Sequence, residues 1–219
     1  MKKIGVIFDL DGVIFDNNQY HKKAWSEFCN RNGIFLSQQT LENNVFGNTN
    51  KDVLEFLFRR KFTNHEIDDL AEVKEEIYRD LIGPHVKPLD GLIPLLEELK
   101  NNEIPTGIAT SAPKSNIDFL DEKVKFTRFF HSIIDDKGVE NGKPHPDIYL
   151  KCFKELDVEP QNCLVFEDSF SGVRSAVKAG GKVVGVTTTH DASEFEGVEM
   201  AIPDFTEMKL NTIQKILGD

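Results

Sequence analysis

The chain has few cysteines, no long hydrophobic run and a shortage of positive charge. Its three cysteines, Cys29, Cys152 and Cys163, have no paired spacing, so we expect buried thiols and no disulfide framework. Apolar runs stay below the roughly 18 residues of a membrane-spanning helix. Asp9 and Asp11 also interrupt the first apolar run before the apolar core of a secretory signal is complete. We therefore expect a cytoplasmic protein without a membrane partner.

The deficit of positive charge limits which kinds of partner the protein can bind. Lysine and arginine total 26, against 37 aspartates and glutamates, which gives a formal net charge of −11 at pH 7. A protein of this charge is repelled by the phosphate backbone of nucleic acids and by anionic membrane surfaces. We therefore expect neither as the main partner, and we expect a monomer that acts on a small molecule.

The second part of the chain alternates short helices with short strands. The expected strands are residues 105–110, 131–135, 163–166, 183–186 and 200–202, and the expected helices between them are 91–100, 114–120, 149–156 and 172–179. Together with an apolar run at residues 4–8, this alternation predicts an α/β fold with a doubly wound parallel sheet, because crossovers between parallel strands return right-handed. Residues 200–202 are expected at an edge of the sheet.

A helical stretch interrupts this alternation after the first strand. Amphipathic patterns predict helices over residues 20–32, from Asn50 as N-cap, and from Thr63 or Asn64 to about residue 82. We expect residues 16–85 to form an inserted helical cap domain, with residues 1–15 and 86–219 forming the α/β core. A cap hinged over a catalytic crevice excludes water and carries specificity residues. A packing lobe that never moves is the alternative.

The most informative stretch is the end of the first apolar run. Residues 4–8 lead into Asp9 and Asp11, and Gly12 follows. Open parallel sheets bind ligands in the crevice outside the carboxyl ends of their strands, where both carboxylates could share a cation or a proton. An ordinary turn would use the same residue types, so this motif alone leaves both interpretations open.

Three further stretches combine an apolar strand or an ordered loop with residues suited to phosphate chemistry. They are Gly107–Ser111, Gly142–Pro146 and Leu164–Ser169. With the first stretch they supply a nucleophile, a hydroxyl donor, a cation and a pair of metal-binding acids. Taken singly, each has a simpler explanation as a helix cap or a solvated surface charge.

On these four motifs, in this order, the chain resembles the haloacid dehalogenase-like hydrolase superfamily. The resemblance is strongest to the branch that contains β-phosphoglucomutase and small sugar-phosphate phosphatases, and it extends over nearly the whole chain. It implies an α/β core with a small helical cap, Mg²⁺ as cofactor and phosphoryl transfer from a small phosphorylated metabolite.

The first three motifs carry the expected chemical steps. Asp9 is the expected nucleophile, forming an aspartyl-phosphate, and Asp11 is the expected general acid and base. Thr110 would offer its hydroxyl to the phosphoryl group. Lys143, held by the stiff Pro144 and Pro146 that follow it, would be the fixed cation.

The expected metal ligands are oxygen atoms. Mg²⁺ prefers near-octahedral oxygen ligands and usually keeps several waters. We expect Asp168 and Asp9 to bind it through their side chains, with Glu167 binding directly or holding a water. The resemblance adds the backbone carbonyl of Asp11 as a further ligand. A solvated helix cap is the simpler interpretation of the acidic pair.

Further residues are expected to contact the substrate. The amides of Ser111 and Ala112 lie where a helix is expected to begin, which favours an anion. The resemblance implies contacts from four more residues, and Gly47 and Asn50 are also expected to contact the substrate. The four are His21, Trp25, Lys74 and Asn116. For His21 and Trp25, a polar helix start and simple core packing are the alternatives.

Asn50 bears on the choice between phosphatase and mutase. In the resembled mutases this position holds an arginine that grips the second phosphate of the substrate, a bidentate contact that asparagine cannot make. We therefore expect a phosphatase acting on a sugar phosphate. A β-phosphoglucomutase-type mutase is the alternative, because Lys51, Arg59 or Arg60 could supply the charge, and a non-catalytic phosphate-binding protein is a remoter one.

Overall fold

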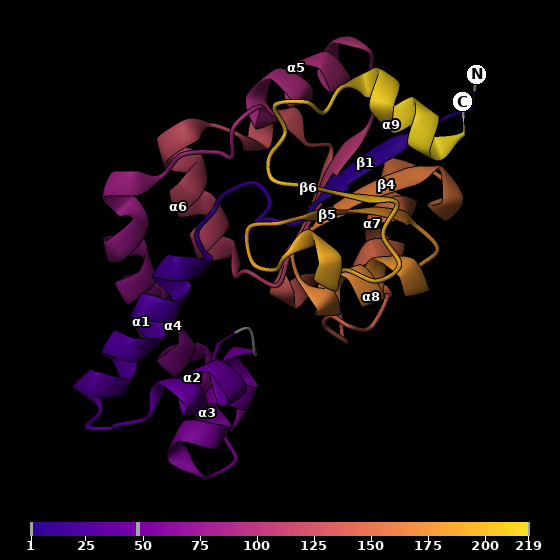
Figure 1. Cartoon of the computed structure of the whole chain (residues 1–219). Helices are drawn as coiled ribbons and strands as arrows, with labels where there is room; N and C mark the ends of the chain where they lie inside the picture. The colour runs from indigo at the N-terminus through magenta and orange to yellow at the C-terminus, as the bar shows by residue number, and fades with distance from the viewer. Residues whose placement is uncertain (1, 47–48, 219) are drawn as a thin grey trace. The chain divides into compact units, whose positions relative to one another are not determined.

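The computed structural model describes residues 2–46 and 49–218 (Figure 1). The chain divides into two compact units. The core unit combines Met1–Asp16 with Lys87–Asp219, and the helical unit is Asn17–Val86.

The core unit contains one parallel sheet. Over the described residues its six strands are β1 (Gly5–Phe8), β2 (Thr106–Ala109), β3 (Ser132–Ile134), β4 (Cys163–Glu167), β5 (Lys182–Val186) and β6 (Met200–Ile202). Their order is β3-β2-β1-β4-β5-β6, and every neighbouring pair is parallel. The predicted doubly wound α/β fold is therefore confirmed, with β6 at an edge as expected.

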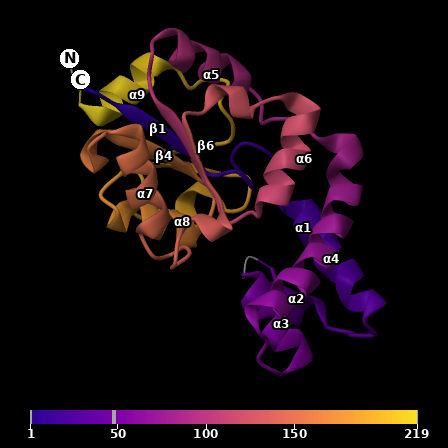
Figure 2. The same cartoon turned by 180° about the vertical axis from the view of Figure 1, so that it is seen from behind.

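Helices cover both faces of this sheet. They are α5 (Leu92–Asn101), α6 (Lys114–Val124), α7 (Asp147–Leu156), α8 (Phe170–Lys178) and α9 (Leu210–Leu217), with short 3₁₀ turns at Thr127–Phe129, Asp136–Gly138, Pro160–Asn162 and Ala192–Glu194. Helices α7 and α8 pack on one face, whereas α9 packs on β4 from the other face together with α5 (Figures 1 and 2). The sequence patterns did not predict α9.

Side-chain alternation along the central strands separates two apolar layers. Ile7 of β1 and Val165 of β4 belong to the buried cluster beneath α7 and α8. Phe8 and Phe166 face the opposite way and stack with ring centroids 5.0 Å apart, and Phe205 packs edge-on against Phe166. Since side chains alternate with a period of two, the residues two positions after Ile7 and Val165 are expected on the α7 side.

The helical unit consists of α1 (Asn18–Arg31), α2 (Gln38–Asn44), α3 (Asn50–Phe58), α4 (Asn64–Ile82) and the 3₁₀ turn Gly83–His85. Helix α1 packs along α4. Helix α2 was not predicted. Asn50 was wrongly predicted as an N-cap: Thr49 caps α3 by accepting from the amide of Asp52, so Asn50 is the first helical residue. Thr63 and Glu66 form a capping box at α4.

The structure also addresses the sequence expectations for the cysteines and for membrane-spanning helices. All three cysteines are buried and free, as predicted, and burial raises the pKa of Cys152 and of Cys163 to about 12. Within residues 2–46 and 49–218, none of the helices has the length and apolar character needed to cross a bilayer.

Candidate active site

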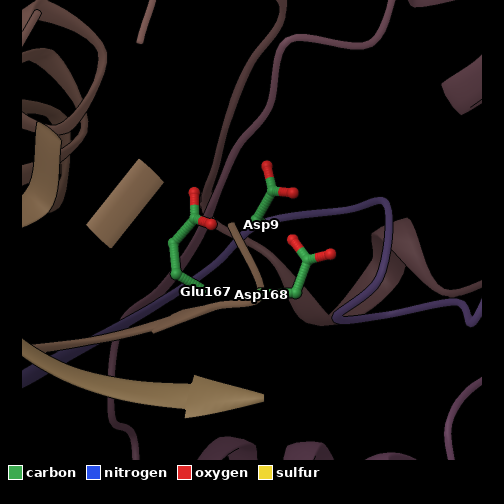
Figure 3. Close-up of side chains that lie close together, drawn as sticks. All are labelled: Asp9, Glu167 and Asp168. Carbon is green, nitrogen blue, oxygen red and sulfur yellow. The ribbon is translucent and has the colours of Figure 1, made fainter. Parts of the chain in front are cut away.

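Three carboxylates meet where β1 and β4 end. The two strands pair in register, Phe8 with Phe166, and the amide of Asp9 donates to the carbonyl of Phe166 at 3.0 Å. This register sets Asp9 beside Glu167. The carboxylate oxygens of Asp9, Glu167 and Asp168 lie within 4.8 Å of one another, and the side chains project to the same side of the strand ends (Figure 3). All three residues are buried.

Lys143 lies against this cluster and comes from the loop before α7. Its Nζ donates to Oδ1 of Asp9 at 2.7 Å, to Oε1 of Glu167 at 2.6 Å and to the carbonyl of Ala109 at 3.0 Å. Its side chain is only 6% exposed. Burial alone would lower the pKa of Lys143, but the carboxylates of Asp9 and Glu167 outweigh it and raise that pKa. Lys143 is therefore a permanent cation beside Asp9.

Glu167 uses both of its oxygens for hydrogen bonds within the protein. Oε1 accepts from Lys143 at 2.6 Å and from the hydroxyl of Tyr149 at 2.7 Å. Oε2 accepts from the amide and the hydroxyl of Ser169, each at 3.1 Å. An ionised carboxylate has about four acceptor sites. The acceptor sites of the Glu167 carboxylate are therefore filled by protein donors, and Glu167 holds Lys143 in position.

The charge balance of the cluster suits a bound cation. Three carboxylates face one ammonium group, and burial raises the pKa of Asp9 well above its ordinary value. The charges of Glu167 and Asp168 add to this rise, while Lys143 opposes it. A divalent cation with oxygen ligands would relieve the excess of negative charge, and carboxylate oxygens are the ligands that Mg²⁺ prefers. The residues present therefore fit Mg²⁺.

Asp11 lies in the turn after β1. The turn closes through the amide of Gly12, which donates to the carbonyl of Phe15 at 2.7 Å, and Gly12 has a φ of 78°, a conformation that favours glycine. Asp11 is half-buried. Among the described residues its side chain is not a member of the three-carboxylate cluster.

The loop after β2 contains three of the expected site residues, and the helix that follows it, α6, contains a fourth. Thr110 is buried, and its Oγ1 accepts from the amide of Ala112 at 3.0 Å. That amide is thereby engaged by Thr110, while the hydroxyl proton of Thr110 can still be donated elsewhere. Ser111 is exposed, and Asn116 is buried in the first turn of α6.

The helical unit gathers four other expected residues around one acid. Lys74 pairs with Glu75, and its Nζ lies 3.4 Å from Nδ1 of His21 and 5.2 Å from the ring centroid of Trp25. Asn50 donates to Oε1 of Glu75 at 3.1 Å. Lys74 and Glu75 are both buried. Glu75 was not predicted as a site residue.

One expected substrate contact cannot be placed, and the sequence prediction missed three residues that hydrogen-bond to the acids of the site. Gly47 lies outside the described residues. Tyr149, Ser169 and Thr189 were not predicted, although Tyr149 and Ser169 hold Glu167 and Thr189 donates to Oδ2 of Asp168. Ser169 follows the acidic pair directly and could have been found. Tyr149 and Thr189 lie on other elements, so no local pattern marks them.

Gly172 is required by the packing of Glu167. A Cβ at this position would lie 1.7 Å from Oε1 of Glu167. We expect Gly172→Ala to displace the carboxylate, to lower the free energy of unfolding by about 1–3 kcal/mol and to reduce turnover with it. Chemical denaturation and steady-state kinetics measure both effects. Gly142→Ala, where a Cβ meets open space, is the control, and equal stability of the two variants would contradict the expectation.

The fold and the site together define a class of enzyme. The class is an α/β enzyme whose buried carboxylates meet a buried lysine at the carboxyl ends of adjacent parallel strands. This is the place where such sheets bind ligands. The particular family follows from a family model described as haloacid dehalogenase-like hydrolase, which matches residues 6–186. The chain belongs to this family of enzymes.

Relatives and solved structures agree with this assignment. Validoxylamine A 7'-phosphate phosphatase of Streptomyces hygroscopicus subsp. limoneus is 30% identical over 205 residues, covering 93% of this chain and 94% of the relative. Beta-phosphoglucomutase of Bacillus subtilis (strain 168) is 34% identical over 188 residues, covering 83% and 82%. The crystal structure of a HAD hydrolase, family IA, variant 3, from Entamoeba histolytica matches with a TM-score of 0.90 at 32% identity and covers 100% of both chains.

Proposed function

We propose that the protein is a Mg²⁺-dependent phosphatase that hydrolyses a small phosphorylated metabolite, a sugar phosphate, through a phosphorylated Asp9. The observation that carries the proposal is the ammonium group of Lys143, 2.7 Å from Oδ1 of Asp9 within a buried cluster of three carboxylates. Membership of the hydrolase family and relatives named as a phosphatase and a phosphoglucomutase support phosphate chemistry. A monomeric, cytoplasmic protein is part of the same proposal, as the acidic composition favours.

The reaction proceeds in two displacements. A carboxylate oxygen of Asp9 attacks the phosphorus, a new P–O bond forms to Asp9, and the bond from phosphorus to the leaving oxygen breaks. Asp11 gives its proton to that leaving oxygen. Asp11 then takes a proton from a water molecule, whose oxygen attacks the same phosphorus and releases inorganic phosphate from Asp9. Lys143 stabilises the negative charge that the phosphoryl group carries in both steps, and Thr110 donates its hydroxyl to it.

Asp9, Asp168 and the backbone carbonyl of Asp11 are the groups that would hold Mg²⁺. When bound, the ion supplies positive charge that the single lysine cannot. Glu167 does not need to be a ligand in this scheme, because its oxygens serve Lys143, Tyr149 and Ser169. Its task is to keep Lys143 in place.

The polar cluster of the helical unit favours a phosphatase over a mutase. We assign this unit the role of a cap that selects the substrate. At Asn50 the unit offers an amide that donates to Glu75, and Glu75 also pairs with Lys74. Neither the amide of Asn50 nor the ammonium group of Lys74, which is paired with Glu75, offers the bidentate contact of an arginine to a second phosphate group, which a mutase must retain between turnovers. A phosphoglucomutase activity is the alternative function, supported by the 34% identity to the Bacillus subtilis enzyme.

A double substitution in the helical unit should admit a second phosphate. In Asn50→Arg alone, the new guanidinium would pair with Glu75, so we expect little change in KM for a sugar bisphosphate. In Asn50→Arg with Glu75→Gln the guanidinium no longer has this carboxylate as a partner and can contact the second phosphate. The KM for the bisphosphate should then fall by about tenfold, in keeping with a charged hydrogen bond of about 1.5 kcal/mol. Each KM is expressed relative to that of an aryl phosphate for the same variant. Glu75→Gln alone is the control, and an equal gain from all three variants would contradict the proposal.

A turnover assay tests the proposed function directly. The protein is incubated with a generic aryl phosphate and Mg²⁺, with and without a chelator, and then with a panel of phosphorylated sugars. Isomerisation of β-glucose 1-phosphate is followed separately from phosphate release. Release of phosphate that stops on chelation supports the phosphatase. Isomerisation without release would favour the mutase, and no reaction of either kind would favour a binding protein.

A further inference from the structure

We infer that the hydroxyl groups of Tyr149 and Thr189 divide the acidic pair between two tasks. Tyr149 orients Glu167, which in turn positions Lys143, and Thr189 orients Asp168 as a ligand for the metal ion. Both are positioning residues for the reaction proposed above, and the inference rests on that function. Neither residue belongs to the four sequence motifs.

Tyr149 contacts both members of the buried ion pair. Its side chain is fully buried on α7, and its hydroxyl donates to Oε1 of Glu167 at 2.7 Å. The Nζ of Lys143 lies 5.1 Å from the centroid of its ring. One aromatic side chain therefore fixes the acid through a hydrogen bond and supports the ammonium group through a cation–π contact.

The buried hydroxyl of Tyr149 has a chemical reason to be there. Phenylalanine would fill nearly the same space at this position without the cost of burying a polar group. The phenol donates to the oxygen of Glu167 that also accepts from Lys143. Burial raises the pKa of Tyr149 well above its ordinary value, so the phenol keeps its proton and remains a donor. Removing the hydroxyl leaves Oε1 with Lys143 alone, so that only Ser169, through Oε2, still fixes the orientation of the carboxylate.

Asp168 is held by a different hydroxyl from a different strand end. Thr189 follows β5, the neighbour of β4, and its Oγ1 donates to Oδ2 of Asp168. Glu167 accepts hydrogen bonds from Tyr149 and Ser169, whereas Asp168 accepts one from Thr189, so the two neighbouring acids have separate supports. Partners of this kind orient metal-binding carboxylates, and their loss commonly costs 10- to 100-fold in metal affinity or activity.

Two single substitutions separate the tasks. With Tyr149→Phe, kcat for an aryl phosphate should fall by about tenfold, while the Mg²⁺ concentration for half-maximal rate stays within about twofold of wild type. With Thr189→Val, that Mg²⁺ concentration should rise by about tenfold, while kcat at saturating Mg²⁺ stays within about threefold. If the two residues had a purely structural role, one variant would not lower kcat alone while the other raised the Mg²⁺ requirement alone.

Cys152→Ala provides the matched control. Cys152 is buried on the same helix as Tyr149 and contacts Ser132 at 3.8 Å through sulfur, so its loss loosens α7 without touching the acids. If this variant loses as much thermal stability as Tyr149→Phe and as much kcat, the role of Tyr149 is structural and the inference fails. It also fails if Tyr149→Phe keeps full kcat, or if both hydroxyl variants change the Mg²⁺ requirement equally.

Failure of the proposed function is distinguishable from failure of the inference. If the wild-type protein releases no phosphate, the phosphatase proposal fails, and calorimetric titration with Mg²⁺ alone then tests the inference. Weaker Mg²⁺ binding by Thr189→Val, with unchanged binding by Tyr149→Phe, would support the division of tasks. Equal binding by both variants would overturn it.

Discussion

Replacement of Asp9 by asparagine is expected to reduce phosphate release at least about a thousandfold, because an amide cannot act as the attacking carboxylate. The protein should stay folded. Asparagine has nearly the same shape as aspartate, and it removes one of three negative charges that crowd the ends of β1 and β4. Steady-state phosphate release measures the loss, and circular dichroism with a thermal melt checks the fold.

A trapping experiment identifies the phosphorylated atom. Beryllium fluoride mimics a phosphoryl group on a carboxylate, so the wild-type protein incubated with it and Mg²⁺ should form an adduct on Asp9, visible by ¹⁹F NMR. Asp9→Asn should form none. An adduct of equal strength in Asp9→Asn, or turnover within tenfold of wild type, would exclude Asp9 as the nucleophile.

Replacement of Lys143 by methionine is expected to have the second large effect, and it should act on stability as well as on turnover. Lys143 is buried and donates to both Asp9 and Glu167. Removing one partner of a buried ion pair typically costs about 3–5 kcal/mol, because the remaining charges lose their counter-ion. For a chain of this size, a loss of about 3 kcal/mol lowers the melting temperature by roughly 6–12 °C. Turnover should fall at least about a thousandfold.

Lys151→Met is the matched control for this experiment. Lys151 is an exposed lysine on α7 whose Nζ donates to the carbonyl of Gly138 at 2.8 Å. Its replacement should change the free energy of unfolding by no more than about 0.5 kcal/mol. The account of Lys143 would be wrong if the two variants melted at the same temperature, or if Lys143→Met kept its activity.

The strand ends and the acids that follow them were predictable because they are local in the sequence. An apolar run that ends in Asp9, or in Glu167 and Asp168, signals both a buried strand and the place where it delivers charge. The α/β class with a parallel sheet followed from alternation and handedness, whereas the order of the strands was not predicted. Helices α2 and α9 escaped prediction. Helix α2 has no buried residue to mark an apolar stripe, and no pattern was assigned beyond residue 202.

The supports of the site were harder to predict because they are not local. Tyr149 lies on a helix whose apolar face already explains an aromatic residue, so nothing in its neighbourhood indicates a hydrogen bond to Glu167. Glu75 follows Lys74 directly on a helix, where adjacent residues ordinarily point apart. Its pairing with Asn50 depends on how α3 packs against α4. Such contacts come from tertiary packing, which a single sequence does not encode in any one window.

The salt bridge between Asp9 and Lys143 spans 134 positions of the chain. A fragment of the core that ends before residue 168 lacks part of the cluster of acids and lysine, since its members come from the end of β1, from the loop before α7 and from the end of β4. Ligands that recognise this cluster therefore bind only when these three segments are assembled, and they stabilise the folded core over states in which one of the segments is detached. Ligand binding to the cluster would therefore report on the assembly of these three segments.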